Sequence, residues 1–236
     1  MKIYTVIFFI LFIVACSDNS KNNKISTLVL SINNNDESIL ITTDTIKQEV
    51  NSNFEHLDIE WLEKNGEKNS FGKGKFSYRY EYKTDSSYIQ INGDNVNGYS
   101  SNEYLQGKYF YTFKNYYKNG NIKEKGLCFH LGSFKKGVWY EFNISGKLVE
   151  TVDYDQFYKF TFEDILRLCE KRNLFIEEVI SSSDSDIPTT ISRYYHTELK
   201  HIWVINWLKT STIMQTLTID GNTGKVIKTE DSRIYQ

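Results

Sequence analysis

The sequence predicts a mainly β protein of the α+β class, built from antiparallel hairpins with one clear helix. Its composition favours strands, because 17 Tyr and 15 Phe stand beside a single alanine, Ala15, and a single proline, Pro188. Aromatic and polar residues alternate over 73–83 (KGKFSYRYEYK), which is typical of a strand with one packed face. Clusters rich in Asn, Asp and Gly separate such runs and indicate turns.

Charge and composition exclude several classes of protein. The chain has 28 Lys and Arg against 30 Asp and Glu, a formal net charge of −2. This balance argues against a nucleic-acid protein held by a basic face, because such binding depends on neutralising phosphates. Hydrophobic residues make up 40% of the 236 positions, too many for a disordered chain. Three cysteines are too few for a disulfide-dense miniprotein.

The N-terminal residues have the pattern of an export signal. Residues 1–15 (MKIYTVIFFILFIVA) have a basic start, an apolar core and a small residue at the end, which is the pattern of a cleaved signal peptide. Residues 13–16 (IVAC) resemble the lipobox of bacterial lipoproteins. The resemblance implies lipid attachment at Cys16, and Ser17 directly after it resembles the outer-membrane sorting signal of Gram-negative lipoproteins. Residues 16–24 are polar and without periodicity, which indicates a flexible tether. An ordinary secretory signal that contains a cysteine is the alternative.

The next segment, 25–100, is expected to be rich in β structure. Short β-branched runs at 27–32 and 38–43 flank a turn-prone Asn cluster and predict a hairpin. Apolar residues at a spacing near 3.6 leave a helix open over 45–61. The alternating run at 73–83 then predicts a strand, followed by another around Tyr88 to Ile91.

Residues 101–156 contain an internal repeat with a period of 26. Gly120 and Gly146 occupy equivalent positions, and each glycine is expected to supply the positive φ of a turn into a strand. The shared pattern of an aromatic residue, a glycine, an aliphatic residue and a glutamate resembles divergent MORN-type repeats of bacterial antitoxin-like and lipoprotein sequences. The resemblance implies a sheet of stacked hairpins that binds a partner or acts as a spacer, and no catalytic residues.

The C-terminal region, 157–236, is expected to form a small α+β module. Thr161 and Asp164 form a capping box for a helix that Asn173 ends. Strands are expected at 174–180, 191–196, 201–209, 212–219 and 225–229, with a loop at 181–190. The end of this region, from Ile219 to Ile227 (IDGNTGKVI), resembles PepSY-type envelope modules, and only their fold is carried over.

The histidines and cysteines, which often form catalytic or metal sites, can be explained here without such a site. His196 and His201 are five residues apart and are expected to flank a hairpin turn rather than to share a metal. His130 lies near Cys128 without a third group placed by spacing. Cys128 and Cys169 could form a disulfide or be two buried thiols, and the sequence leaves both open. No cofactor or metal is expected.

The sequence therefore favours a non-catalytic, membrane-anchored lipoprotein that binds or scaffolds a protein or peptide. Its possible binding face consists of aromatic residues of the repeat, namely Tyr109, Tyr111, Tyr116, Tyr117 and Trp139. Ordinary sheet core and surface are the other interpretation of the same pattern. Two rival functions stay open: an envelope hydrolase whose site is assembled only by folding, and an immunity or antitoxin-like protein.

Overall fold

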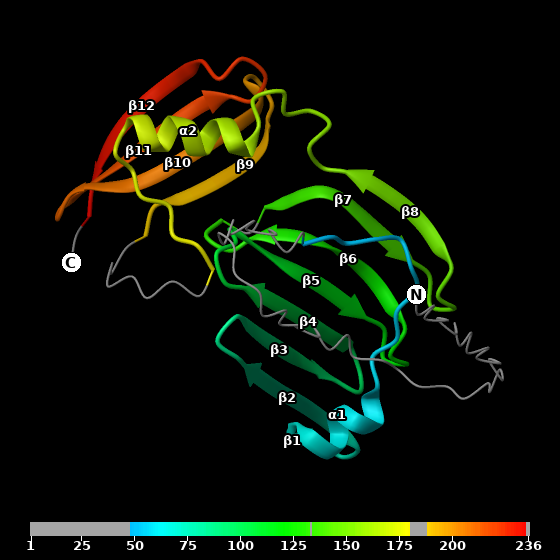
Figure 1. Cartoon of the computed structure of the whole chain (residues 1–236). Helices are drawn as coiled ribbons and strands as arrows, with labels where there is room; N and C mark the ends of the chain where they lie inside the picture. The colour runs from blue at the N-terminus through cyan, green and yellow to red at the C-terminus, as the bar shows by residue number, and fades with distance from the viewer. Residues whose placement is uncertain (1–47, 133, 180–187, 235–236) are drawn as a thin grey trace, which may run out of the picture. The chain divides into compact units, whose positions relative to one another are not determined.

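A computed structural model describes residues 48–132, 134–179 and 188–234 (Figure 1). Strands dominate this part of the chain, in an eight-stranded and a four-stranded antiparallel sheet with two helices. The prediction of a mainly β fold with one clear helix is confirmed. The expected signal peptide, lipid site, tether and strands at 27–32 and 38–43 lie outside the described residues, as does most of the loop at 181–190.

The larger sheet is a meander in which every strand pairs with the next one along the chain. This order follows from short turns, which leave each strand no closer partner than its predecessor. The expected boundary at residue 100 falls inside β4, and the sheet continues across it without a break. The eight strands are β1 (Glu67–Gly72), β2 (Lys75–Lys83), β3 (Ser87–Asp94), β4 (Gly98–Leu105), β5 (Phe110–Tyr116), β6 (Ile122–Phe129), β7 (Lys135–Phe142) and β8 (Leu148–Asp153).

The internal repeat folds into two successive hairpins, β5–β6 and β7–β8. In the first turn the Gly120 amide donates to the Tyr117 carbonyl at 2.8 Å, and in the second the Gly146 amide donates to the Asn143 carbonyl at 2.8 Å. The two glycines have φ values of 81° and 84°, which confirms the expected positive φ. A side chain would be strained at either position.

One face of the larger sheet is covered by α1 (Ile59–Asn65) and by the residues before it. The helix that the apolar spacing left open over 45–61 does not form over 48–58. Here the backbone binds the sheet instead of itself: the Leu57 amide donates to the Gly120 carbonyl at 2.8 Å, and the Glu55 carbonyl accepts from the Ile122 amide at 3.0 Å. The apolar spacing therefore reflects contacts with the sheet, and α1 begins only after Asp58, whose carboxylate caps it.

Glu55 holds this N-terminal segment on the sheet. Its carboxylate accepts hydrogen bonds from the ammonium groups of Lys114 and Lys125, each at 2.5 Å. The Lys125 side chain is fully buried, and its ammonium also donates to the Asn53 carbonyl at 2.7 Å. Burial alone would raise the pKa of Glu55, but the hydrogen bonds and charges of the two lysines outweigh it and hold that pKa below its usual value.

The smaller sheet has the order β12-β11-β10-β9, so β9 is an edge strand. Before it comes α2 (Phe162–Lys171), which begins with the expected capping box of Thr161 and Asp164 and is followed by Asn173 with φ 55°. Four of the five C-terminal strands are confirmed, and they are β9 (Thr190–His196), β10 (Lys200–Thr210), β11 (Ile213–Asp220) and β12 (Val226–Arg233).

The strand expected at 174–180 is wrong for the described residues 174–179, which pair with no strand. Ile176 and Val179 are nevertheless buried, with exposed fractions of 6% and 2%. The Val179 amide donates to the carbonyl of Lys108, a loop residue. The apolar residues of 174–179 therefore reflect burial in the core rather than pairing in a sheet.

A single aromatic core joins the two sheets and α2. The Phe162 ring of α2 lies 4.9 Å from the ring of Phe110 and 5.3 Å from that of Phe129, both in the larger sheet. Phe134 packs edge-on against Trp203 of β10, with ring centroids 5.3 Å apart. These contacts fix β9 and β10 against the segment that connects β6 to β7.

Replacing Glu55 by glutamine tests whether its ion pairs with Lys114 and Lys125 stabilise the N-terminal segment on the sheet. At pH 7 we expect Glu55→Gln to lower the free energy of unfolding by about 3 kcal/mol, because it leaves the buried Lys125 without its carboxylate. A carboxylate with a depressed pKa stabilises the fold above its unfolded-state pKa and ceases to do so as the pH falls through its folded pKa. The difference between variant and wild type should therefore shrink below about pH 4.5, as measured by urea unfolding.

The control is Glu81→Gln, because Glu81 is an exposed residue that pairs with Arg79 on the surface. This variant should unfold close to the wild type at every pH. Equal stability of Glu55→Gln and wild type at pH 7, or a difference that does not change with pH, would contradict the prediction.

Candidate functional site

The structure does not bring the five predicted aromatic residues together on one exposed face. Tyr116 and Trp139 belong to the interior, with exposed fractions of 6% and 1%. Burial accordingly raises the pKa of the Tyr116 hydroxyl. Tyr117 is half-buried, and its hydroxyl donates to the Phe142 carbonyl at 3.0 Å. These three aromatic residues therefore contribute to the packing and hydrogen bonding of the sheet.

Tyr109 and Tyr111 have other roles. The Tyr109 ring packs edge-on against Phe162 at 5.8 Å and so contributes to the joining core. Tyr111 stacks on Tyr104, and Tyr104 on Tyr88, at centroid distances of 4.9 and 5.6 Å across three neighbouring strands. Rings stacked on one another cover each other's faces, which removes the flat aromatic surface that a sugar or a peptide ring would use.

The histidines and cysteines also have structural environments. His196 pairs with Lys200 across the turn between β9 and β10, as expected from their spacing. Within the described ranges no group of three His, Cys, Asp or Glu residues is placed to hold a metal ion. The Nδ1 atom of His130 lies 3.0 Å from the Tyr109 carbonyl. Cys128 and Cys169 are both buried free thiols, and burial raises the pKa of Cys169 to about 11.

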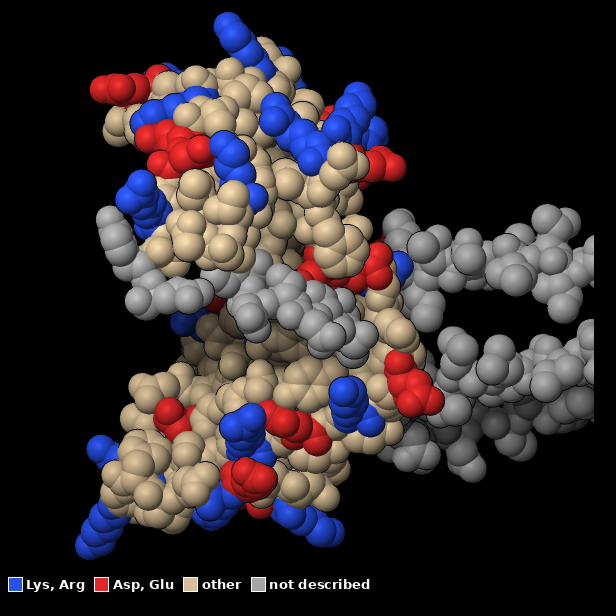
Figure 2. All heavy atoms as spheres, turned by 90° about the vertical axis from the view of Figure 1, so that its left-hand side faces the viewer, with Lys and Arg blue, Asp and Glu red and all other residues tan. Residues whose placement is uncertain are grey.

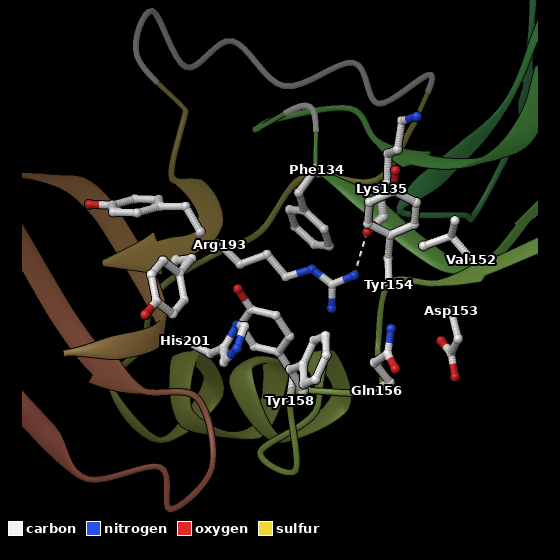
Figure 3. Close-up of a pocket in the computed structure, with 12 residues that line it drawn as sticks. Phe134, Lys135, Val152, Asp153, Tyr154, Gln156, Tyr158, Arg193 and His201 are labelled. Atoms are coloured by element: carbon white, nitrogen blue, oxygen red, sulfur yellow. Dashed lines mark hydrogen bonds between the residues drawn. The ribbon is translucent and has the colours of Figure 1, made fainter. Parts of the chain in front are cut away.

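A cavity of about 410 Å³ opens beside β9 (Figure 3). Its volume lies within the range of ligand pockets, about 300–1,000 Å³. Three separate stretches of the chain build it: the start of β7, the end of β8 with the loop after it, and the hairpin β9–β10. Its lining residues are Phe134, Lys135, Val152, Asp153, Tyr154, Gln156, Phe157, Tyr158, Arg193, Tyr194, Tyr195 and His201.

Arg193 occupies the middle of this cavity (Figure 3). Its side chain is only 6% exposed, and its guanidinium lies 4.6 Å from the ring centroid of Tyr158 and 4.9 Å from that of Phe134. One Nη2 hydrogen is donated to the Lys135 carbonyl. Nη1 lies 2.7 Å from Oδ1 of Asp155. That buried oxygen has no partner with hydrogen-bond geometry in the part of the chain that the structure describes, so the contact is an ion pair rather than an aligned hydrogen bond.

The rim of the cavity is aromatic and partly open to water. Phe157 lies flat on the His201 ring, with centroids 4.8 Å apart and planes 8° apart, and Tyr195 meets the same imidazole edge-on at 5.3 Å. Phe157 and Tyr195 are more than half exposed. Exposed aromatic rings that are held in place by their neighbours provide contact area at a low cost in conformational entropy.

The outer edge of β9 faces the same cavity. A Cβ atom added to Gly132, in the β6–β7 connection, would lie 1.7 Å from the Ile191 carbonyl oxygen, so this carbonyl points away from β10. In an antiparallel strand, backbone groups with the same direction recur at every second residue. The amides and carbonyls of Arg193 and Tyr195 therefore point outward as well. Among the described residues they make no backbone hydrogen bond across this edge.

The charged residues that line the cavity are Lys135, Arg193 and Asp153, and the Asp155 carboxylate lies against the Arg193 guanidinium. Burial alone would lower the pKa of Lys135, but its hydrogen bond and charge interaction with Glu124 outweigh burial and raise it. Both cations therefore have a carboxylate partner, Glu124 for Lys135 and Asp155 for Arg193. Elsewhere, Figure 2 shows Lys and Arg interspersed with Asp and Glu over the face that it presents, in keeping with the balanced composition.

Sequence reasoning missed this site because its residues come from three distant stretches. Arg193 sits inside a run predicted as a strand, and Asp155 lies in a turn after the repeat. The one available signal was an arginine in a strand flanked by Ile191 and two tyrosines, which is an unusual neighbourhood for a charge that must be buried or paired. No spacing rule connects it to Phe134 or Tyr158.

No family model, no curated protein and no solved structure matches the chain. Neither described helix, α1 nor α2, has the length and apolar character that crossing a membrane requires.

A substitution at Gly132 tests the contact that closes one end of the β9 edge. We expect Gly132→Ala to lower the free energy of unfolding by about 1–3 kcal/mol, because its methyl group would overlap the Ile191 carbonyl. The matched control is Gly72→Ala, where the nearest atom to an added Cβ is 3.4 Å away on a flexible lysine. Unfolding of the two variants in urea would show the difference, and equal midpoints would mean that the contact is absent.

Proposed function

We propose that this chain is a non-catalytic lipoprotein of the cell envelope that binds an extended segment of a protein partner along the edge of β9. The observation that carries the proposal is the outward backbone of Arg193 and Tyr195 beside an aromatic cavity. Anchoring is proposed from the lipobox-like residues 13–16, with the acyl chains on Cys16 and residues 16–24 as the tether.

An added strand would form hydrogen bonds with the outward amides and carbonyls of this edge. Backbone hydrogen bonds supply affinity without regard to sequence, and alternate side chains of the added segment enter pockets that supply specificity. Here one set of alternate side chains would face the cavity between Tyr154, Tyr158 and Tyr195. The other set would face away from it, which leaves those positions of the partner unconstrained.

The rival functions have less support in the geometry. A hydrolase that uses two carboxylates needs both free to act at one cleft, whereas here Asp153 lines the cavity and Asp155 is paired with Arg193. An immunity protein would bind one toxin, which is a special case of partner binding and would use the same edge. We therefore propose peptide or protein binding as the activity and treat the nature of the partner as a separate question.

The anchor is tested by mass spectrometry of the protein isolated from a bacterial host that acylates lipoproteins. We expect the wild type to lack residues 1–15 and to carry acyl chains on Cys16, and to fractionate with membranes. Cys16→Ala should keep residues 1–15 or lack lipid, because the thiol is the acceptor. Cleavage without acylation in the wild type would contradict the proposal and favour the ordinary secretory signal.

The edge is tested by selecting linear peptides from a random displayed library on the full chain in detergent micelles. We expect the selected peptides to lose at least tenfold in affinity on Tyr195→Pro, since proline removes an outward amide and places its ring on the edge. Tyr195→Phe, which keeps the amide, is the matched control. Thermal unfolding of both variants shows whether the fold is intact.

Modified peptides provide a measurement that leaves the protein unchanged. N-methylation at successive positions of a selected peptide should weaken binding at every second residue, because only alternate amides face β9. A selection that yields no peptides, or peptides whose affinity ignores both Tyr195→Pro and N-methylation, would overturn the proposed function.

A further inference from the structure

The β9 edge is open at one end and closed at the other. The open part runs along Tyr195 and Arg193, next to the cavity. At Ile191 the β6–β7 connection lies so close that Gly132 leaves no room for a side chain. The Arg193 guanidinium is bonded to the Lys135 carbonyl at the same end. A segment added along this edge must therefore end, or turn away, as it reaches Arg193.

Arg193 lies at this closed end, and most of its N–H donors have no acceptor among the described residues. A guanidinium has five N–H groups in one plane, and within the described residues they meet one hydrogen-bond acceptor, the Lys135 carbonyl. The Asp155 carboxylate supplies charge to Nη1 but no aligned hydrogen bond. The rings of Phe134 and Tyr158 lie within 5 Å of the guanidinium. Contacts of the guanidinium charge with ring faces use none of its N–H groups as donors to an acceptor atom, so these groups stay available to a ligand.

The ligand group that matches such an edge is a carboxylate. Arginine donates two parallel hydrogen bonds to the two oxygens of a carboxylate, and the bonds are stronger than neutral ones. The cation that such a ligand meets in the cavity is Arg193, because the ammonium of Lys135 is hydrogen-bonded to Glu124. A cationic chain end, the α-amino group, would be repelled by the guanidinium and could not accept its hydrogen bonds.

The walls define the rest of the ligand. They are formed mainly by aromatic rings, with Phe134, Tyr154, Tyr158 and Tyr195 among them. An apolar side chain would gain about 25 cal/mol for each Å² that it buries there. An apolar side chain and a carboxylate on one Cα atom occur together only at the C-terminus of a peptide. An aspartate or glutamate would place its carboxylate at Arg193 but leave the aromatic walls without an apolar partner.

From the closed edge, the free donors of Arg193 and the aromatic walls, we infer that the cleft binds the C-terminus of its partner. The last residues add to β9 as a strand, the final side chain fills the aromatic cavity, and the α-carboxylate accepts hydrogen bonds from Arg193. This inference rests on the proposed function and narrows its partner to proteins with an exposed, extended, apolar C-terminus.

The test compares two synthetic pools of random octapeptides that differ only at the chain end. One pool has free C-terminal carboxylates and the other has C-terminal amides. Each pool is passed over the immobilised full chain in detergent micelles, and the retained peptides are quantified and sequenced. We expect at least tenfold greater retention of the free acids, with apolar residues enriched at the last position. A hydrogen-bonded charge worth about 1.5–3 kcal/mol corresponds to a factor of tenfold or more.

Arg193→Lys separates recognition from structure. Lysine keeps the charge but cannot donate two parallel hydrogen bonds, so the ratio of retained acids to amides should fall by about tenfold. A purely structural effect would lower the retention of both pools alike and leave that ratio unchanged. Arg79→Lys, on the exposed surface of β2, is the matched control and should leave both retention and ratio as in the wild type.

The outcomes distinguish the two levels of the argument. Equal retention of acids and amides, with loss of both on Tyr195→Pro, would overturn C-terminal recognition and keep strand addition. Enrichment of internal aspartate or glutamate in both pools would also overturn it, in favour of an acidic side chain at Arg193. Retention of neither pool would overturn the proposed function together with this inference.

Discussion

The packing of Phe162 against Phe110 and Phe129 is the interaction on which the rest of the structure depends. It presses α2 onto the larger sheet, and through Phe134 and Trp203 it carries the smaller sheet with it. The cavity exists because this core fixes the β6–β7 connection against β9 at a set distance. Strand pairing alone could not do so, since no strand of one sheet pairs with a strand of the other in the described residues. The site therefore owes its geometry to side-chain packing between layers.

The same aromatic richness lets the fold place buried and partly buried cations against ring faces. Lys125 lies near the Phe142 ring, Lys135 lies 3.8 Å above the centroid of Trp139, and Arg193 lies among three rings. Each also has a carboxylate partner, because a ring face alone offsets little of the cost of burying a charge. The partners of the two lysines, Glu55 and Glu124, accept proper hydrogen bonds. The partner of Arg193 does not, and this difference separates a cation that holds the fold from one with donors left for a ligand.

Local signals in the sequence were sufficient for much of the fold and for none of the cleft. The turns at Gly120 and Gly146 and the capping box at Thr161 depend on a few neighbouring residues, and all three are present as expected. Periodicity left a helix open over 48–58 and predicted a strand over 174–179, and neither forms. The apolar residues of both segments pack against distant parts of the chain, which periodicity cannot distinguish from a helix or a strand. The predicted aromatic face failed to assemble for a related reason. Alternation along a strand divides neighbours between two sides, so Tyr111 stacks with Tyr104 while Tyr116 enters the core.

The two sheets have four edges, and the way each is protected explains why one of them is proposed to bind. β1 and β12 carry charged residues such as Lys68 and Lys228 along exposed strands, a common defence against pairing with another chain. β8 exposes Val149 but also Glu150, and its residues before Val152 are not among those that line the cavity beside β9. β9 has neither a proline nor a lysine within it, and its protection is steric, from the closed end at Ile191 and the rim at Tyr195. Steric protection excludes a second sheet or a long strand but admits a narrow segment that ends inside the cleft. This protection is in keeping with the proposed recognition of a chain end, whose carboxylate would accept hydrogen bonds from Arg193.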